Sequence, residues 1–535
     1  MIAFTTIFWV FISLIFGFIA LIIYSTIRLK LTFRSKNVLY LAKAPFFTVY
    51  YLYIKKKARF ELGQMNYDQM KAAKVPVAAD TDMGSINYTV TDLEILKHIF
   101  VKDFDHFVNR RAFKMPDNDI LIKKMLVFLK DEEWKGLRSK LSPTFTTGKI
   151  KRLFPLFNES AKKLVKYVDQ MMMESSHGEI DLGDGYSKFT MDTIASAVCG
   201  MNSQAFDQKE PSIFEQVGKS IQITFNMKTL VRFLILFGFP RLAGKLGITI
   251  FGSVLHQFFD GAVKSSIKER TTTGQKGNDF IQLMLEAREN KLKTEEEELS
   301  NFEKDAIITG EVKGQISEML DDNGIVSNCV LFILAGFDTT QSLLLFCAYA
   351  LAIHPEIQDK LRQEVDTVLE ENDGDFTYDS IHRMAYLDMV INETLRFYPP
   401  APITDRNCTR DYVFPGTDIT VKKGEAVTIH IYGIHHDEEY YPEPEKFDPE
   451  RFSPENRGKI NTYAFLPFGQ GPRNCIGMRF ALTEVKLAIA QLVHNFDIEP
   501  SRKTTIPMEY HDAGSLKPKN GMWLSLKRRP GTTSD

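Results

Sequence analysis

The sequence predicts a mainly helical α+β fold, in which one large domain follows a single apolar N-terminal segment. Apolar residues recur at helical spacing over most of residues 92–320, and a nearly continuous apolar stretch follows at about 321–353. Beyond residue 399 the composition turns to proline, glycine and β-branched residues, which indicates short strands and irregular chain. A chain of 535 residues is long enough for one domain of unusual size.

The N-terminal segment is expected to anchor the protein in a membrane. Residues 2–27 contain no charged side chain, and about 20 apolar residues suffice to cross the hydrocarbon core. Arg28, Lys30, Arg34 and Lys36 follow at once, which places the downstream domain in the cytosol. A cleaved signal peptide is the alternative, but the segment lacks a basic start and a small-residue cleavage site. We therefore expect residues 1–28 to form an uncleaved signal-anchor.

Charge and cysteine content exclude several classes of protein. A net charge of −2 gives no overall attraction to nucleic acid or to anionic lipid. The five cysteines are scattered and odd in number, and none has CxxC spacing. A disulfide framework and a zinc site are therefore not indicated, and the main domain is expected in a reducing compartment.

The order of elements can be predicted for the second half of the chain. One long helix should begin at residues 321–323, remain buried on all sides and stop before Pro355. Helices are expected near 355–369 and 384–398, and a last amphipathic helix over 478–495. Earlier in the chain, 84–88 reads as a strand, 174–178 and 271–278 as breaks, and the charged run 291–313 as a solvated helix and loop.

The segment 468–477 carries the strongest chemical signal. Its glycines, Gly469, Gly471 and Gly477, allow tight turns with positive φ. Cys475 comes just before the last helix, where free N–H groups and the helix dipole favour an anion and lower the pKa of a thiol. A lone cysteine is more often a buried apolar residue, as we expect for Cys199, Cys329 and Cys347.

The pattern FxxGxRxCxG in this segment resembles the haem-binding signature of the cytochrome P450 superfamily. The resemblance implies the P450 fold and a haem b whose iron takes the Cys475 thiolate as axial ligand. Phe468 would cover the sulfur and Arg473 would reach an anionic group of the cofactor. On this interpretation residues 29–79 form a linker and the start of the catalytic domain, and 80–535 form its haem-thiolate body.

Two further motifs match the same superfamily. Glu393 and Arg396 stand at i and i+3 on one helix, a pairing that alone is ordinary. It resembles the ExxR motif, whose partner arginine has a match in Arg451. A guanidinium suits a buried bidentate pair better than an ammonium, so this triad is expected to hold the fold around the haem.

An acid–alcohol pair, Asp338 and Thr339, lies midway along the predicted buried helix. Polar residues are costly there unless they have a role, and Thr339 can bond back to the Ala335 carbonyl beside Gly336. The alternative is a helix kink with a satisfied threonine. In the family, the matching pair guides protons during oxygen activation, and next to the Cys475 motif this interpretation is favoured.

The remaining site residues follow from the resemblance, which covers residues from about 80 onward. Trp134 and Arg138 resemble the family's WxxxR motif, and with Arg406 and Arg473 they would bind the haem propionates. Segments near 102–111 and 141–145 look like the animal microsomal clan that metabolises foreign compounds. The proline-rich hinge usual behind the anchor is absent, with only Pro45 nearby. The predicted substrate contacts are Phe104, Phe107, Phe113, Phe332, Ala335, Ala401, Ile403 and Leu516, with Ser515 beside the last.

The implied reaction inserts one atom of O2 into an apolar organic substrate such as a xenobiotic, steroid or lipid, at the endoplasmic reticulum membrane. No nicotinamide or flavin motif is present, so electrons should come from NADPH-cytochrome P450 reductase, with cytochrome b5 as a further donor. The cations expected at the docking surface are Lys135, Lys140, Arg479 and Lys486, although single surface charges commonly have no such role.

Three alternatives remain at this stage. A haem isomerase or dehydratase on the same fold would turn over hydroperoxides without a reductase. A haem-based sensor would bind ligand but consume no reductant. A structural membrane protein without cofactor would require all three motif matches to be accidental.

Overall fold

The computed structural model describes residues 57–82, 85–111, 119–175, 177–207, 238–250, 253–292, 319–511 and 515–532, and shorter pieces at 20, 23–24, 27–31, 33, 38–41, 50–51, 232, 235–236 and 304–308. Most of the predicted membrane anchor, the predicted substrate contact Phe113 and most of the charged run 291–313 lie outside the described residues. The described chain forms two compact units, Met1–Arg111 with Ile403–Ile434, and Ala112–Pro402 with His435–Asp535.

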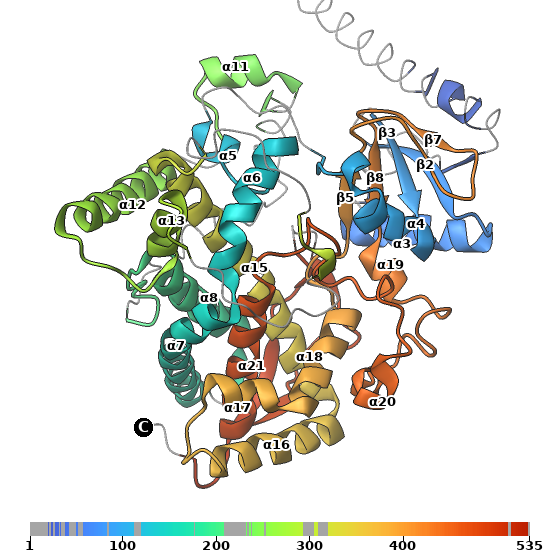
Figure 1. The fold of residues 1–535 in the computed structure, drawn as a ribbon. Helices are drawn as coiled ribbons and strands as arrows, with labels where there is room; N and C mark the ends of the chain where they lie inside the picture. The colour runs from blue at the N-terminus through green and yellow to red at the C-terminus, as the bar shows by residue number, and fades with distance from the viewer. Residues whose placement is uncertain are drawn as a thin grey trace, which may run out of the picture. The chain divides into compact units, whose positions relative to one another are not determined.

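The first unit is built around a five-stranded mixed sheet with the order β1-β2-β3-β8-β5 (Figure 1). Strands β2 and β3 form an antiparallel hairpin, β3 and β8 are parallel, and β8 and β5 are antiparallel. The strands of this unit are β1 (Leu39–Tyr40), β2 (Val77–Asp82), β3 (Ser85–Val90), β5 (Thr404–Asn407), β6 (Tyr412–Val413), β7 (Thr420–Val421) and β8 (Ala426–Ile429). Its helices are α3 (Arg59–Ala72), α4 (Leu93–Lys97), the π-helical turn His98–Lys102 and the 3-10 turn Phe104–His106.

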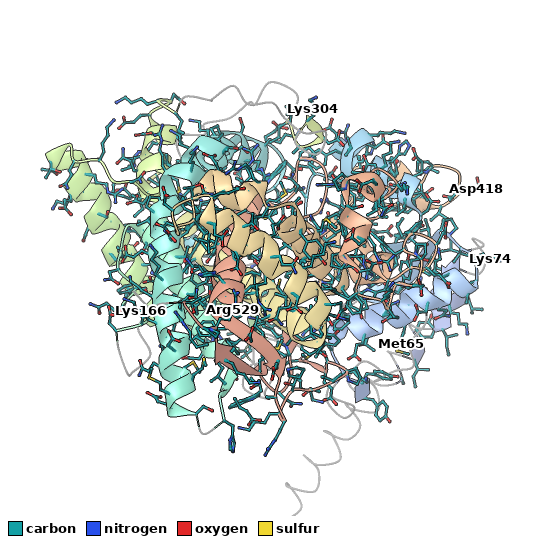
Figure 2. All side chains as sticks on the ribbon, turned by 90° about the horizontal axis from the view of Figure 1, so that it is seen from below. Met65, Lys74, Lys166, Lys304, Asp418 and Arg529 are labelled. Atoms are coloured by element: carbon teal, nitrogen blue, oxygen red, sulfur yellow. The ribbon has the colours of Figure 1, made fainter. Side chains whose placement is uncertain are left out.

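Charged side chains mark the outer surface of this first unit. Lys74, just after α3, and Asp418, in the turn between β6 and β7, are both exposed (Figure 2). Helix α19 (Ile431–His435) begins in this unit and ends at the first residue that belongs to the second.

The second unit holds most of the helices. They are α5 (Ile120–Lys123), α6 (Asp131–Leu141), α7 (Thr147–Glu174), α8 (Leu182–Cys199), α11 (Pro240–Lys245), α12 (Ser253–Thr273), α13 (Phe280–Arg288), α15 (Asp322–Ile353), α16 (Pro355–Glu370), α17 (Tyr378–Arg383), α18 (Ala385–Phe397), α20 (Pro454–Arg457) and α21 (Met478–Asn495), with 3-10 turns at Ser142–Phe145 and Pro449–Phe452. The predicted helix-dominated α+β class is confirmed.

Two small sheets complete the second unit. Strands β4 (Glu179–Asp181), β12 (Trp523–Arg528) and β9 (Phe496–Pro500) form an antiparallel sheet in that order. Strands β10 (Tyr510–His511) and β11 (Lys517–Pro518) form an antiparallel pair, which we call the C-terminal hairpin. These pairings bring the end of the chain against the helical core.

Helix α15 runs through the centre of the second unit and packs against α8, α21 and α18 (Figure 1). Its first turn is capped by Asp321, whose carboxylate accepts a hydrogen bond from the Gly324 N–H, and Pro355 begins the next helix. Among the described residues it is the helix long and apolar enough to cross a membrane, but most of its side chains are buried in the protein. The predicted central core helix is therefore present.

The sequence predicted several boundaries closely. Helix α21 spans the predicted residues 478–495, and α16 and α18 fall within a residue or two of their predicted ends. The break after residue 174 is present, whereas α12 continues to Thr273, so the predicted loop at 271–278 begins later. The predicted strand at 84–88 corresponds to β3, which starts at Ser85.

Candidate active site

Cys475 lies in a compact turn just before α21. Gly469 and Gly471 have φ values of 70° and 69°, and the Cys475 N–H donates to the Phe468 carbonyl over 2.8 Å. Positive φ is costly for other residues, so these two positions require glycine. The same prediction for Gly477 is wrong, because this residue is the N-cap of α21 with φ of −92°.

The Cys475 thiol differs from the other cysteines in its exposure. Cys199, Cys329, Cys347 and Cys408 are buried, whereas Cys475 is exposed. Burial raises the pKa of the Cys347 thiol to about 12, so that side chain stays protonated. Cys475 is thus the cysteine that a ligand can approach.

Two arginines and a tryptophan surround the turn that carries Cys475. Arg138, on α6, donates from Nη1 to the Asn474 carbonyl over 3.0 Å and from Nη2 to its side-chain Oδ1 over 2.6 Å. Arg473 donates to the Leu129 carbonyl over 2.7 Å, and its guanidinium lies 4.0 Å from the centre of the Trp134 ring. The structure therefore brings together three of the four residues predicted to bind the propionates.

The fourth, Arg406, belongs to strand β5 of the first unit. Its side chain is almost fully buried and stacks 4.9 Å from the Phe100 ring centre. Nη1 donates to the Asp405 carbonyl over 2.7 Å, but the buried Nε has no partner. Burial, with the charge of Arg110, lowers the pKa of Arg406 to about 9. A buried guanidinium with an unused donor suits an anionic ligand group.

The buried triad is assembled as the sequence suggested. Arg396 donates from Nε and Nη2 to the two carboxylate oxygens of Glu393, each over 2.8 Å, and both side chains are 0% exposed. Nε of Arg451 lies 3.5 Å from Glu393 Oε1, which also accepts the Asp448 N–H over 2.8 Å. Burial raises the pKa of Glu393, and Arg396 opposes this. The predicted contacts among Glu393, Arg396 and Arg451 are therefore present in the folded chain.

His435 connects this triad to the cysteine turn, and no sequence motif points to it. Leu466, two residues before Phe468, donates its N–H to His435 Nε2 over 2.9 Å, so Nδ1 carries the proton. Nδ1 then donates to the Arg396 carbonyl over 3.1 Å, while Arg396 Nη1 donates to the His435 carbonyl over 2.8 Å. Burial lowers the pKa of His435 well below its ordinary value, so the ring is neutral.

Helix α15 has a solvent-exposed stretch at its centre. Ala335 and Thr339 are exposed and Asp338 is partly exposed, although the rest of the helix between its end turns is largely buried. The predicted back-bond is present, since the Thr339 hydroxyl donates to the Ala335 carbonyl over 2.6 Å. A Cβ on Gly336 would lie 2.8 Å from Ile194, so glycine allows α8 to pack closely here.

Asp338 is held by the C-terminal hairpin, which the sequence did not indicate. Ser515 donates its hydroxyl to Asp338 Oδ2, and Lys517 Nζ lies 3.2 Å from Oδ1. The two contacts come from residues 177 and 179 positions further along the chain, a separation that no local pattern reveals.

The predicted substrate contacts fall in different environments. Phe107 is fully buried with its ring edge-on to Tyr412 at 5.0 Å, and Phe332 is buried against Phe145 and Phe280. These two aromatic side chains are placed as core residues. The other described positions are Phe104 and Leu516, which are buried, Ile403, which is half-buried, and Ala335 and Ala401, which are exposed.

One predicted docking cation is misplaced. Lys486 is buried on α21 and pairs with Asp388 over 3.0 Å, so it does not contribute to a cationic surface. A helix position cannot be assigned to the solvent face from charge alone, because a long side chain can pair internally. Lys135, Lys140 and Arg479 are at least partly accessible.

These residues fit a haem b. In the second unit, the exposed thiol in its glycine turn could ligate the iron as in a haem-thiolate enzyme, and the guanidiniums beside that turn could pair with the propionates.

Comparison with known proteins supports this class. Residues 81–525 match the profile described as "Cytochrome P450", and the chain belongs to that family. It is 36% identical to cytochrome P450 9e2 of Blattella germanica, over 93% of this chain and 94% of the relative. It is also 36% identical to cytochrome P450 3A13 of Mus musculus, over 83% of each chain, and 33% identical to cytochrome P450 6B1 of Papilio polyxenes, over 89% and 91%.

The enzyme is therefore a cytochrome P450 monooxygenase with haem b and cysteine-thiolate ligation. Its reaction uses O2, an organic substrate and electrons from a redox partner.

Proposed function

We propose that this monooxygenase oxidises apolar organic compounds of varied structure with electrons from NADPH-cytochrome P450 reductase, and that cytochrome b5 is a second donor. The observation that carries the proposal is the acid–alcohol pair on α15. Asp338 and Thr339 are accessible to solvent, although most of this helix is buried. An enzyme that only rearranges a peroxide has no need of proton delivery at this position.

Each residue of the cysteine turn has a distinct role in this proposal. Cys475 would supply the thiolate that holds the haem iron, and the haem when bound would supply the oxygen chemistry. Phe468 would cover the sulfur, and its carbonyl accepts the Cys475 N–H, which keeps the two residues close together in the turn. Arg138 and Arg473 would bind the propionates, and Arg138 also fixes Asn474 next to Cys475.

A second set of residues is proposed to hold the cofactor-binding residues in place without reacting. Trp134 holds the Arg473 guanidinium against its ring. Arg406 is assigned to a propionate by the family resemblance, and its buried guanidinium has an unused donor. Glu393, Arg396 and Arg451 keep the segment before the cysteine turn in place, with His435 as the connecting residue. None of these residues needs to take part in proton or electron transfer.

Proton movement is assigned to α15. The Thr339 hydroxyl donates to the Ala335 carbonyl, so its oxygen lone pairs remain available to accept a hydrogen bond on the exposed side. Asp338 supplies the ionisable group next to it. Together they can pass protons from water to the reacting oxygen while the surrounding buried helix excludes bulk solvent.

The substrate is expected to meet mainly apolar surface. Ala335, Ala401 and Ile403 are the accessible members of the predicted contact set, and none offers a polar group to fix one orientation. Foreign compounds are thus favoured over a single polar metabolite. The chain is equally similar to an insect and a rodent relative, so the similarity favours a class of apolar substrates and no single compound.

We further propose that the enzyme is held at the endoplasmic reticulum membrane by one span near residues 1–28, with its catalytic domain in the cytosol. The support is sequence-based, namely an uncharged segment followed by Arg28 and Lys30.

The decisive experiment compares two oxidant supplies. The purified full chain is incubated with a diverse panel of apolar substrates, either with reductase and NADPH or with a hydroperoxide alone. Products that require reductase and O2 support the proposal. Hydroperoxide turnover without oxygenated products would favour the isomerase alternative, and ligand binding without NADPH consumption would favour a sensor.

A further inference from the structure

The carboxylate of Asp338 points toward the C-terminal hairpin. Both its oxygens are engaged, Oδ2 by the Ser515 hydroxyl and Oδ1 by the Lys517 ammonium at 3.2 Å. The neighbouring Thr339 hydroxyl is bonded within its own helix instead. Any change in the charge or orientation of Asp338 must therefore involve the hairpin.

The Lys517–Asp338 pair is only partly accessible to water. Their side chains are 12% and 22% exposed, and Lys517 also donates to the side-chain oxygen of Gln341, one turn further along α15. Gln341 is fixed in turn, because its amide donates to the Gly183 carbonyl over 2.8 Å. Burial lowers the pKa of Lys517, and the charge of Asp338 opposes this. An ammonium in such a place requires its carboxylate partner.

The hairpin segment is anchored on both sides. Between Ser515 and Lys517, the Leu516 carbonyl accepts the Ser342 hydroxyl from α15, and the Leu516 N–H donates to the Pro400 carbonyl over 3.0 Å. Leu516 is one of the predicted substrate contacts, and Pro400 directly precedes another, Ala401. A shift of this segment on substrate binding would reach Asp338 through the residues that flank Leu516.

We propose that Lys517 is a positioning residue for oxygen activation, which holds the Asp338 carboxylate in the orientation that proton delivery requires. The inference rests on the role assigned to Asp338 under the proposed function and deepens it. The hairpin would then link two tasks, because the predicted substrate contact Leu516 lies between the two residues that hold the acid. Ser515 assists by binding the second carboxylate oxygen.

Replacement of Lys517 by methionine tests this role with a side chain of similar length and no charge. We expect Lys517→Met to lower product formed per NADPH by at least about threefold, with the lost reductant recovered as hydrogen peroxide. Lys517→Arg should retain coupling, since it restores the cation. Haem content and the substrate-induced Soret shift should stay near wild type, which separates lost coupling from a damaged pocket.

The matched control is Lys519→Met. Lys519 lies two residues further along the same hairpin segment and pairs with Glu509 over 2.9 Å at the surface, so the same substitution there should leave coupling unchanged. A double-mutant cycle adds the direct evidence. In an Asp338→Asn background, Lys517→Met should have little further effect if it acts through Asp338.

The outcomes are distinguishable. Absence of reductase-dependent product from the wild-type enzyme would reject the proposed function itself. A wild-type enzyme that turns over, together with a Lys517→Met enzyme that stays coupled, would reject the inference alone. If Lys517→Met does not assemble with haem, two other variants decide instead. They are the charge-balanced double variant Asp338→Asn/Lys517→Met and the single variant Ser515→Ala. Equal coupling in Ser515→Ala and wild type, or identical coupling in the double variant and wild type, would then overturn it.

Discussion

Arg138 holds Asn474, the residue directly before Cys475, by two hydrogen bonds to its backbone and side-chain oxygens at 3.0 and 2.6 Å. A residue predicted to bind a propionate thus also fixes the backbone that presents the ligand. Arg138 can serve both functions because helix α6 carries Trp134 and Arg138 one turn apart, and both contact the turn that holds Cys475.

Replacement of Arg138 by lysine should therefore weaken cofactor retention and ligation together. Lysine cannot form the bidentate contact, and each lost bond to a charged donor is worth about 1.5–3 kcal/mol. We expect a lower haem content and a loss of about tens of per cent of the red-shifted band that thiolate ligation gives in the reduced carbon monoxide spectrum. Asn474→Ala, which keeps the backbone acceptor, should show a smaller change. An Arg138→Lys enzyme with a wild-type spectrum would contradict this role.

Neutralisation of Glu393 should destabilise the folded enzyme severely. Glu393→Gln leaves two guanidiniums near a fully buried neutral amide, a change that typically costs about 3–5 kcal/mol. The measurement is the thermal unfolding temperature together with the yield of folded haem protein. The exposed Lys151–Asp379 pair, 52% and 64% exposed, provides the control, since Asp379→Asn should cost at most about 1 kcal/mol. Comparable losses in the two variants would refute a structural role of the triad.

Removal of the Thr339 hydroxyl should uncouple the enzyme without removing its cofactor. Thr339→Ala deletes the bond to Ala335 and the group assigned to proton delivery. We expect normal haem ligation, a loss of product per NADPH of about tenfold and a matching gain of hydrogen peroxide. Thr339→Ser keeps the hydroxyl and should stay near wild type. Tightly coupled turnover by Thr339→Ala would remove this residue from the proposed relay.

A buried acid on α21 should make stability depend on pH. Glu484 is 1% exposed, and burial raises its pKa well above the usual value, with Thr193 giving partial relief. The folded state thus binds more protons than the unfolded chain, so this contribution to stability is present below about pH 4.3 and is lost as the pH rises.

The variant Glu484→Gln removes the ionisable carboxyl and with it this pH-dependent contribution to stability. Its unfolding temperature minus that of the wild type should therefore increase steadily between about pH 5 and pH 8. A difference that stays constant over this range would show that Glu484 titrates in the same way in the folded and unfolded states.

Much of this site could be predicted because its signals are local. The Cys475 turn, the Glu393–Arg396 spacing and the Thr339 back-bond each arise within one turn or one helix, where sequence spacing fixes geometry. The same is true of α15, because an uninterrupted apolar segment with a capping aspartate and a following proline has few alternatives.

The contacts that were missed depend on tertiary structure. Lys517 and Asp338 are far apart in the sequence, and Lys486 was assigned to the surface because its internal partner Asp388 lies on another helix. His435 carried no motif, and its neutral tautomer follows only from the backbone groups on either side. Such pairings need the topology of the fold, which local propensity does not encode.

The most direct test of the account is the reduced carbon monoxide spectrum of Cys475→Ser in the full chain, beside that of Cys347→Ser as the matched buried control. We predict that Cys475→Ser loses the red-shifted Soret band that thiolate ligation produces, while Cys347→Ser retains it. Retention of that band in Cys475→Ser would contradict the assignment of Cys475 as the haem ligand.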